Sequence, residues 1–359
     1  MTRPVGYYVH HQGAGHWQRA CLIARAMRRP CTLIGTLAEF DRGAAPGAVL
    51  DLSDDRLPEG GFDGRDVAAT RPEAFHYAPL ALPGLRDRMA AIAAWIAEAD
   101  PVLMVVDVSV EVALFTRLMS VPVLIVRLAG TRDDRPHLEA FRSAERLIAP
   151  FPQDLDGTAL PAWVRDKTCY AGFLGANARP GPAPEPDGPI VVVFGRGGTG
   201  GTVAALAAAA RAVPERAWHV LGPVTGAADG PPSNLSSNLP PNLHLHGWVA
   251  DIGPYLARAA LVIGGGGDGV VAAVAAAGRR FVCLPEPRAF GEQTEKAAAL
   301  ERLGAAVVRP SWPEAAAWPA VVEAGLALDP AAISALHDPE AVPRLAATIE
   351  RIAAGLETR

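Results

Sequence analysis

Short apolar runs alternate with helix-like periodicity along the first half of the chain. Residues 5–9 and 102–106 are continuous apolar runs that end at polar residues, a pattern typical of buried strands. Within residues 82–99 the apolar side chains instead recur every three or four positions, which indicates an amphipathic helix. Further strands are expected at 31–35 and 122–126, and further helices within 13–27 and 111–119. Strands that alternate with helices form βαβ units, so this half predicts a parallel sheet.

The same alternation restarts after a proline-rich connector. Residues 178–189 contain five prolines, which exclude a regular element and favour an extended linker. The strands expected beyond it are 190–194, 218–221, 243–246, 260–263 and 281–284, and the helices are 202–212, 270–277, 292–303 and 339–356. We therefore predict an α/β protein with two Rossmann-like domains, residues 1–177 and 190–335, followed by a C-terminal helix within 336–359.

Length, charge and cysteine usage narrow the functional classes. A chain of 359 residues suits two domains. A net charge of −5 gives no general affinity for nucleic acid or for anionic membranes. No apolar run approaches the length of about 18 residues that a membrane span requires, and the apolar start before His10 and His11 is too short for a secretory signal. The four scattered cysteines lack C-x-x-C spacing, so we expect reduced thiols and a cytoplasmic location.

The first half places a histidine and a carboxylate at predicted strand ends. The turn at 13–16, Gly-Ala-Gly-His, follows the first strand, so His16 is expected at the carboxyl edge of the sheet, where α/β proteins bind ligands. A helix N-terminus favours the neutral imidazole that a general base requires. Asp107 ends the run at 102–106 and is expected either to orient His16 or a ligand, or to cap the next helix. A purely structural role is the alternative for His16 and for the neighbouring His10 and His11.

Three loops of the second half predict an anion and sugar site. Residues 195–201 and 264–267 are glycine-rich turns between a strand and a helix, where backbone N–H groups can hold a diphosphate. Glu292 and Gln293, after the strand at 281–284, suit sugar hydroxyls, and Arg288 suits a phosphate or a carboxylate. The alternatives are close helix–sheet packing for the turns and an acid-rich first helical turn for Glu292.

The first glycine turn also fits the dinucleotide fingerprint G-x-G-x-x-G. That fingerprint requires an acidic residue about 20 positions further on, at the end of the next strand. Here the strand at 218–221 is followed by Gly222 and Pro223. A nicotinamide-dependent dehydrogenase is therefore not expected.

The order of these motifs resembles that of type B glycosyltransferases of the family 28 kind. This group is similar to the N-acetylglucosaminyltransferase of peptidoglycan synthesis and to antibiotic glycosyltransferases. The turn at 13–16 resembles the acceptor-side G-x-G-H turn, and residues 105–109 resemble the strand-end aspartate segment. Residues 245–267 resemble the stretch that shapes the base pocket and the donor phosphate loop, and residues 286–293 resemble the donor-sugar motif. The resemblance covers nearly the whole chain and implies two Rossmann-like domains that face each other across a cleft.

The resemblance also implies a reaction and a set of site residues. A sugar would pass from a UDP- or TDP-type donor to a small-molecule acceptor, such as a secondary metabolite, with inversion and without an essential metal or other cofactor. His16 would be the catalytic base with Asp107 beside it, and Gly13, Gly15 and His11 would lie on the acceptor side. Trp248 and Val249 would lie near the nucleobase. The implied donor-side residues are Gly197, Gly198, Thr199, Gly200, Trp248, Val249, Gly265, Gly266, Gly267, Asp268, Arg288, Glu292 and Gln293.

Three positions depart from the family pattern. Gly265 stands where the family usually has His or Ser, Gly269 where it often has Asn, and Ala273 where it usually has a ribose-binding Glu. Loss of that charged hydrogen bond is worth about 1.5–3 kcal/mol. Two other functions therefore stay open: a non-catalytic binding or partner protein, and a sugar-nucleotide epimerase, which would need several carboxylates around the sugar.

Overall fold

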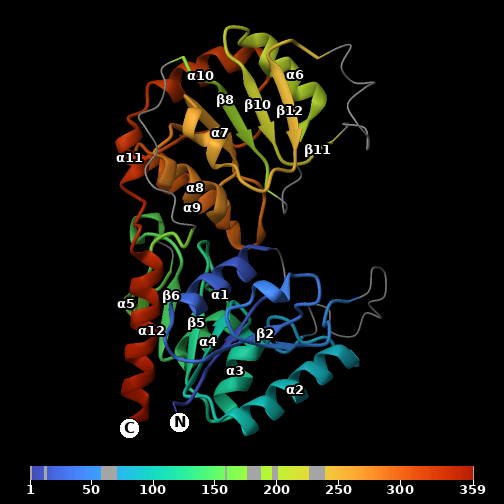
Figure 1. Ribbon diagram of the computed structural model, residues 1–359, viewed down its shortest axis with the longest axis vertical. Helices are drawn as coiled ribbons and strands as arrows, with labels where there is room; N and C mark the ends of the chain where they lie inside the picture. Colours follow the sequence, from blue (N-terminus) through green and yellow to red (C-terminus); the bar gives the residue numbers. More distant parts are fainter. Residues whose placement is uncertain are drawn as a thin grey trace. The chain divides into compact units, whose positions relative to one another are not determined.

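The computed structural model describes residues 2–11, 14–57, 71–157, 160–175, 187–195, 201–225 and 239–358 (Figure 1). The chain forms two compact units, and each unit is discontinuous in sequence. The N-terminal unit comprises Met1–Pro150, Thr158–Leu174 and Glu340–Arg359, and the C-terminal unit comprises Phe151–Gly157 and Gly175–Pro339. The sequence instead suggests two continuous domains. Most of the predicted linker, residues 178–186, lies outside the described residues.

The N-terminal unit contains a seven-stranded parallel sheet in the order β3-β2-β1-β4-β5-β6-β7. Its strands are β1 (Val5–Tyr8), β2 (Cys31–Gly35), β3 (Ala48–Asp51), β4 (Leu103–Asp107), β5 (Val123–Val126), β6 (Arg146–Ala149) and β7 (Thr168–Tyr170). Its helices before the C-terminal segment are α1 (Ala14–Ala26), α2 (Pro83–Ala99), α3 (Val110–Leu118), α4 (Arg135–Ser143) and α5 (Ala162–Lys167). β1, β4 and β5 are buried along their whole length, which explains their continuous apolar sequences.

The C-terminal unit repeats this plan with a six-stranded parallel sheet in the order β12-β10-β8-β13-β14-β15. Its strands are β8 (Ile190–Val193), β10 (Trp218–Leu221), β12 (Leu243–Gly247), β13 (Leu261–Gly264), β14 (Phe281–Cys283) and β15 (Val307–Val308). A separate pair of two-residue strands consists of β9 (Gly201–Thr202) and β11 (Val224–Thr225). The helices are α6 (Val203–Ala212), α7 (Gly253–Arg258), α8 (Asp268–Ala277), α9 (Glu292–Arg302), α10 (Trp318–Leu326) and α11 (Pro330–Ser334).

The strand orders define one topological switch point in each sheet. In the N-terminal sheet the order reverses between β1 and β4, and in the C-terminal sheet it reverses between β8 and β13. Ligands of open α/β sheets bind outside the carboxyl ends of the strands that flank such a point. The loops that follow β1, β4, β8 and β13 are therefore the positions where a site is expected.

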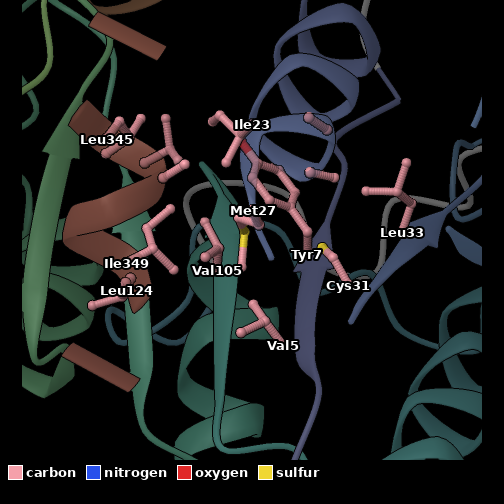
Figure 2. Close-up of a cluster of buried hydrophobic side chains, with 14 of the residues drawn as sticks. Val5, Tyr7, Ile23, Met27, Cys31, Leu33, Val105, Leu124, Leu345 and Ile349 are labelled. Atoms are coloured by element: carbon pink, nitrogen blue, oxygen red, sulfur yellow. The ribbon is translucent and has the colours of Figure 1, made fainter. Parts of the chain in front are cut away.

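The last helix, α12 (Ala341–Glu357), belongs to the N-terminal unit and packs against α1. Figure 2 shows its Leu345 and Ile349 beside apolar side chains that include Val105 and Leu124. An ion pair of 2.7 Å between Arg29 and Glu357 links the C-terminal end of α12 to the segment between α1 and β2. The amphipathic pattern of this helix is predictable from sequence, but its docking on the first unit is not. Among the described residues, no helix is long and apolar enough to cross a membrane.

Candidate functional site

The switch point of the N-terminal sheet brings His16 and Asp107 together. Asp107 is the last residue of β4, and His16 lies in the first turn of α1, which follows the neighbouring strand β1. His16 Nδ1 is 3.0 Å from Asp107 Oδ2, as expected if the carboxylate orients the imidazole. Gly15 precedes His16 on the exposed side of α1, whereas Gly13 lies outside the described residues.

Arg19 is the third member of this group, and the sequence reading did not single it out. Its Nη2 atom lies 2.8 Å from both carboxylate oxygens of Asp107 and 2.9 Å from His16 Nδ1. Arg19 is three residues after His16, so both side chains lie on one face of α1. His16 Nδ1 either donates its proton to Asp107 or accepts one from Arg19, because a neutral nitrogen does one or the other. The first tautomer leaves Nε2 as a base.

Asp107 is fully buried, and its charge depends on these two neighbours. Burial alone would raise the pKa of the Asp107 carboxyl, but the Arg19 guanidinium and His16 outweigh burial and lower the pKa to about 2. Asp107 is therefore ionised at neutral pH. Arg19 neutralises that charge at short range, and the carboxylate is placed to orient the His16 imidazole.

A strained turn holds Asp107 at the strand end. Val108 has a φ of 58°, in the left-handed region that β-branched residues rarely adopt. The Ser109 N–H donates to the Asp107 carbonyl at 2.9 Å and closes a three-residue γ-turn. Ser109 Oγ then accepts from the Val112 N–H at 3.3 Å and caps α3. Strain of this kind costs about 1–3 kcal/mol and concentrates at functional sites.

Two more histidines extend the group along the end of β1. The His10 ring stacks on His11 with a centroid distance of 4.7 Å and lies 5.3 Å from the His16 ring. His11 Nδ1 is 3.5 Å from Asp55 Oδ1, and the fully buried Arg88 pairs with the same carboxylate. His11, which is predicted to lie on the acceptor side, thus has a histidine–aspartate–arginine arrangement of its own, next to that of His16.

In the C-terminal unit, the turn at 264–267 follows β13 at the switch point and leads into α8. The side-chain oxygen of Gln293, on α9, accepts two backbone N–H groups, from Gly266 at 2.9 Å and from Glu286 at 2.9 Å. Gln293 is only 6% exposed. A Cβ on Gly266 would lie 3.0 Å from the backbone carbonyl oxygen of Gln293, a tight contact, so glycine allows the turn to approach α9 closely. Gln293 thus connects the glycine turn to the loop after β14.

Two positively charged side chains of this region form ion pairs with carboxylates of the same unit. Lys296, fully buried on α9, pairs with Asp268 at the start of α8. Arg288 pairs with Glu286 at 2.7 Å, and both are partly exposed. Glu292, the first residue of α9, is partly exposed. Among the described residues, no group of three or more His, Cys, Asp or Glu side chains is arranged to hold a metal ion.

The other predicted donor-side residues divide into three groups. Trp248 follows the carboxyl end of β12 and is 54% exposed, and Val249 after it is partly buried. The turn members Gly197, Gly198, Thr199 and Gly200 lie outside the described residues. Gly265 and Gly267 flank Gly266 in the turn that Gln293 holds; a Cβ on Gly265 would lie 3.3 Å from Gln293 Oε1.

Comparison with known proteins finds a family match within the C-terminal unit. Residues 193–311 match the glycosyltransferase family 28 C-terminal domain. No match was found among curated proteins. The region contains β13, α8, β14 and α9, and therefore both the glycine turn and Gln293. The family resemblance inferred from the motifs is thus confirmed in this part of the chain.

Solved structures identify the fold of the whole chain. It is similar to the glycosyltransferase of kitacinnamycin, with a TM-score of 0.70, 16% identity, and 97% of this chain and 99% of that chain covered. It is also similar to MurG of Acinetobacter baumannii (TM-score 0.68, 17% identity, 97% and 99% covered). A third similar structure is the spinosyn rhamnosyltransferase SpnG complexed with thymidine diphosphate (TM-score 0.68, 18% identity, 97% of this chain and 100% of that chain covered). The chain therefore has the type B glycosyltransferase fold, which confirms the predicted α/β class with two parallel-sheet domains.

The Gln293 contacts change the expected result of substituting this residue. Gln293→Ala removes the acceptor of two backbone N–H groups and loosens the glycine turn, so it should weaken binding of a free nucleoside diphosphate and of the intact donor alike, by about tenfold. Titration calorimetry with both ligands measures this, with Thr294→Ala, an exposed position on the same helix, as the control. Weakening of the intact donor alone would instead assign Gln293 to the sugar.

The buried position of His10 predicts acid sensitivity. Burial, reinforced by His16 and His11, lowers the pKa of His10 to about 3 from 6.5. Below pH 6.5 His10 therefore binds a proton in the unfolded chain but stays neutral in the folded chain. The contribution of His10 to the free energy of unfolding is fully present above pH 6.5 and is lost as the pH falls towards 3. His10→Gln should reduce the fall in unfolding free energy between pH 7 and pH 5 by about 1–2 kcal/mol.

Urea denaturation at the two pH values measures this difference. The control is Thr294→Ala, which alters an exposed residue without a titratable group and should leave the pH slope as it is in the wild type. Equal slopes for wild type and His10→Gln would contradict the assignment.

Proposed function

We propose that this chain, with its type B fold and its family 28 C-terminal domain, is an inverting glycosyltransferase. It moves a sugar from a UDP- or TDP-linked donor to a hydroxyl group of a small-molecule acceptor. The observation that carries the proposal is the pair of His16 and Asp107 at a sheet switch point, in a chain whose residues 193–311 match the glycosyltransferase family 28 C-terminal domain. The thymidine diphosphate in the SpnG structure supports a donor of this type.

The proposed base acts through one nitrogen. With the Nδ1 proton of His16 directed at Asp107, Nε2 is free to take the proton of the acceptor hydroxyl. The acceptor oxygen then forms a bond to the anomeric carbon while the bond from that carbon to the diphosphate oxygen breaks. A single displacement of this kind inverts the anomeric configuration. General-base catalysis typically contributes about 10²–10⁴-fold to the rate.

The diphosphate leaves with the bonding electrons and needs positive potential in the C-terminal unit. The first-turn N–H groups of α8 lack partners within the helix, and the helix dipole adds positive potential there. No step of the proposed reaction needs a metal ion or another cofactor.

A cytoplasmic location is part of the proposal, supported by the four cysteines, all of which are free thiols.

The departure at Ala273 keeps a non-catalytic binding protein as the second candidate. Ala273 is partly exposed on α8 and offers no group for a ribose hydroxyl. Gly265 likewise brings no side chain to the turn. A binding protein of this fold would retain no transfer activity with any donor.

The test is a nucleotide screen followed by a turnover assay. Thermal shift against UDP, TDP, GDP and CDP should show stabilisation by one diphosphate, because ligand at 100 times its dissociation constant adds about 2.7 kcal/mol. The matching nucleotide sugars are then assayed for release of the diphosphate in the presence of a panel of hydroxylated small molecules. Binding without release under any condition would favour the non-catalytic candidate, and the absence of binding would contradict a donor site.

His16→Ala should lower turnover by about 10²–10⁴-fold while the affinity for the donor stays unchanged, because the base acts on the acceptor alone. His244→Ala, at an exposed position, is the matched control. Unaltered turnover in His16→Ala would remove His16 from the reaction.

A further inference from the structure

Asp268 brings a negative charge to the place where a diphosphate would bind. It is the first residue of α8, directly after the glycine turn at 264–267. The N-cap of α8 is Gly267, which makes no side-chain cap. The start of this helix therefore combines free N–H donors with a carboxylate that can fold back onto them. An internal anion in this position would compete with the phosphates of a donor.

Lys296, on the helix α9, pairs with this carboxylate. It lies three residues after Gln293 on α9, on the same helix face, and it is 0% exposed. Its ammonium group pairs with Asp268 Oδ1, whereas the Asp268 side chain stays 22% exposed. Burial raises the pKa of the nearby Cys283 thiol to about 12, so this thiol stays neutral and Asp268 is the counter-ion. An ammonium at zero exposure cannot itself reach a bound ligand without rearrangement.

We propose that Lys296 is a positioning residue for the donor site. It neutralises Asp268 and holds the carboxylate towards α9, which leaves the first-turn N–H groups of α8 to the diphosphate. In this arrangement Asp268 is not a substitute for the ribose-binding Glu that Ala273 replaces, because its carboxylate is engaged by Lys296. The inference rests on the proposed function, since it assigns a role within the donor site.

A double-mutant cycle tests the proposal, with whichever of UDP or TDP binds the wild type as the probe. Lys296→Met leaves Asp268 charged and free to occupy the helix N-terminus, so the affinity should fall about 10–100-fold. Asp268→Asn removes the competing charge but also takes the counter-ion from buried Lys296, so it should lose less affinity than Lys296→Met. The double variant Asp268→Asn/Lys296→Met should recover affinity to within about threefold of the wild type.

Two further measurements separate this role from a structural one. In Lys296→Met the loss should shrink at 0.5 M salt, because the repulsion by an exposed carboxylate is screened. Arg302→Met removes an exposed positive charge from the same helix and should leave the affinity unchanged. If Lys296→Met does not fold, Lys296→Arg, which keeps the charge, and Asp268→Asn are compared instead. An affinity in Asp268→Asn about tenfold or more below that of Lys296→Arg would then overturn the proposal.

The two possible failures are distinguishable. If the wild type binds no nucleoside diphosphate, the proposed function fails. If the wild type binds but Lys296→Met binds equally well, or the double variant stays as weak as Lys296→Met, the role of Lys296 is wrong and the proposed function is untouched.

Discussion

A carboxylate buried at the end of a central strand sets the arrangement of the N-terminal site. Asp107 is fully buried, and removal of one partner from a buried ion pair typically costs about 3–5 kcal/mol. Arg19 and His16 are the partners that compensate the buried charge of Asp107, and both residues lie on α1. The charge of Asp107 therefore fixes the position of α1 against β4, and through α1 the position of the imidazole. The strained turn at Val108 is tolerated because it delivers the carboxylate to this point.

The C-terminal unit uses the same kind of constraint. Its glycine turn has no side chains with which to hold itself, so Gln293 and Lys296 hold it from α9. Both residues are buried and both act at the carboxyl edge of the sheet. In each unit, a helix that follows one strand supplies side chains that order the loop after another strand. The backbone N–H groups and the imidazole are thus placed before any ligand arrives, which is what an efficient site requires.

The sequence predicts the repeated features of the fold well. Continuous apolar runs mark the strands that are buried on both faces, and the proline-rich segment separates two α/β halves. Short edge strands such as Ala48–Asp51 are not predicted, because they are only partly buried and their apolar run, Ala-Val-Leu, is short. The return of Ala341–Glu357 to the first unit was not foreseen, since an amphipathic pattern shows that a helix packs but not against what.

The candidate site is less predictable, because its contacts are made between distant segments. His16 and Asp107 were found by their places at strand ends. Arg19 is not predicted from the sequence, although its position three residues after His16 in an apolar helix is a usable signal. Gln293 was read as a sugar ligand because its residue type suits hydroxyl groups, and only the structure shows its oxygen engaged by two backbone N–H groups. The pairing of Lys296 with Asp268 likewise depends on how two helices pack.

If buried Asp107, neutralised by Arg19, holds the Nδ1 proton of His16, then Nε2 is the base. Nitrogen-15 chemical shifts of the His16 imidazole, assigned by comparison with His16→Gln, report directly which nitrogen carries the proton. We expect a protonated Nδ1 and an unprotonated Nε2 in the neutral ring. A neutral ring with its proton on Nε2 would show that Arg19 donates to Nδ1, and would contradict the assignment of His16 as the base.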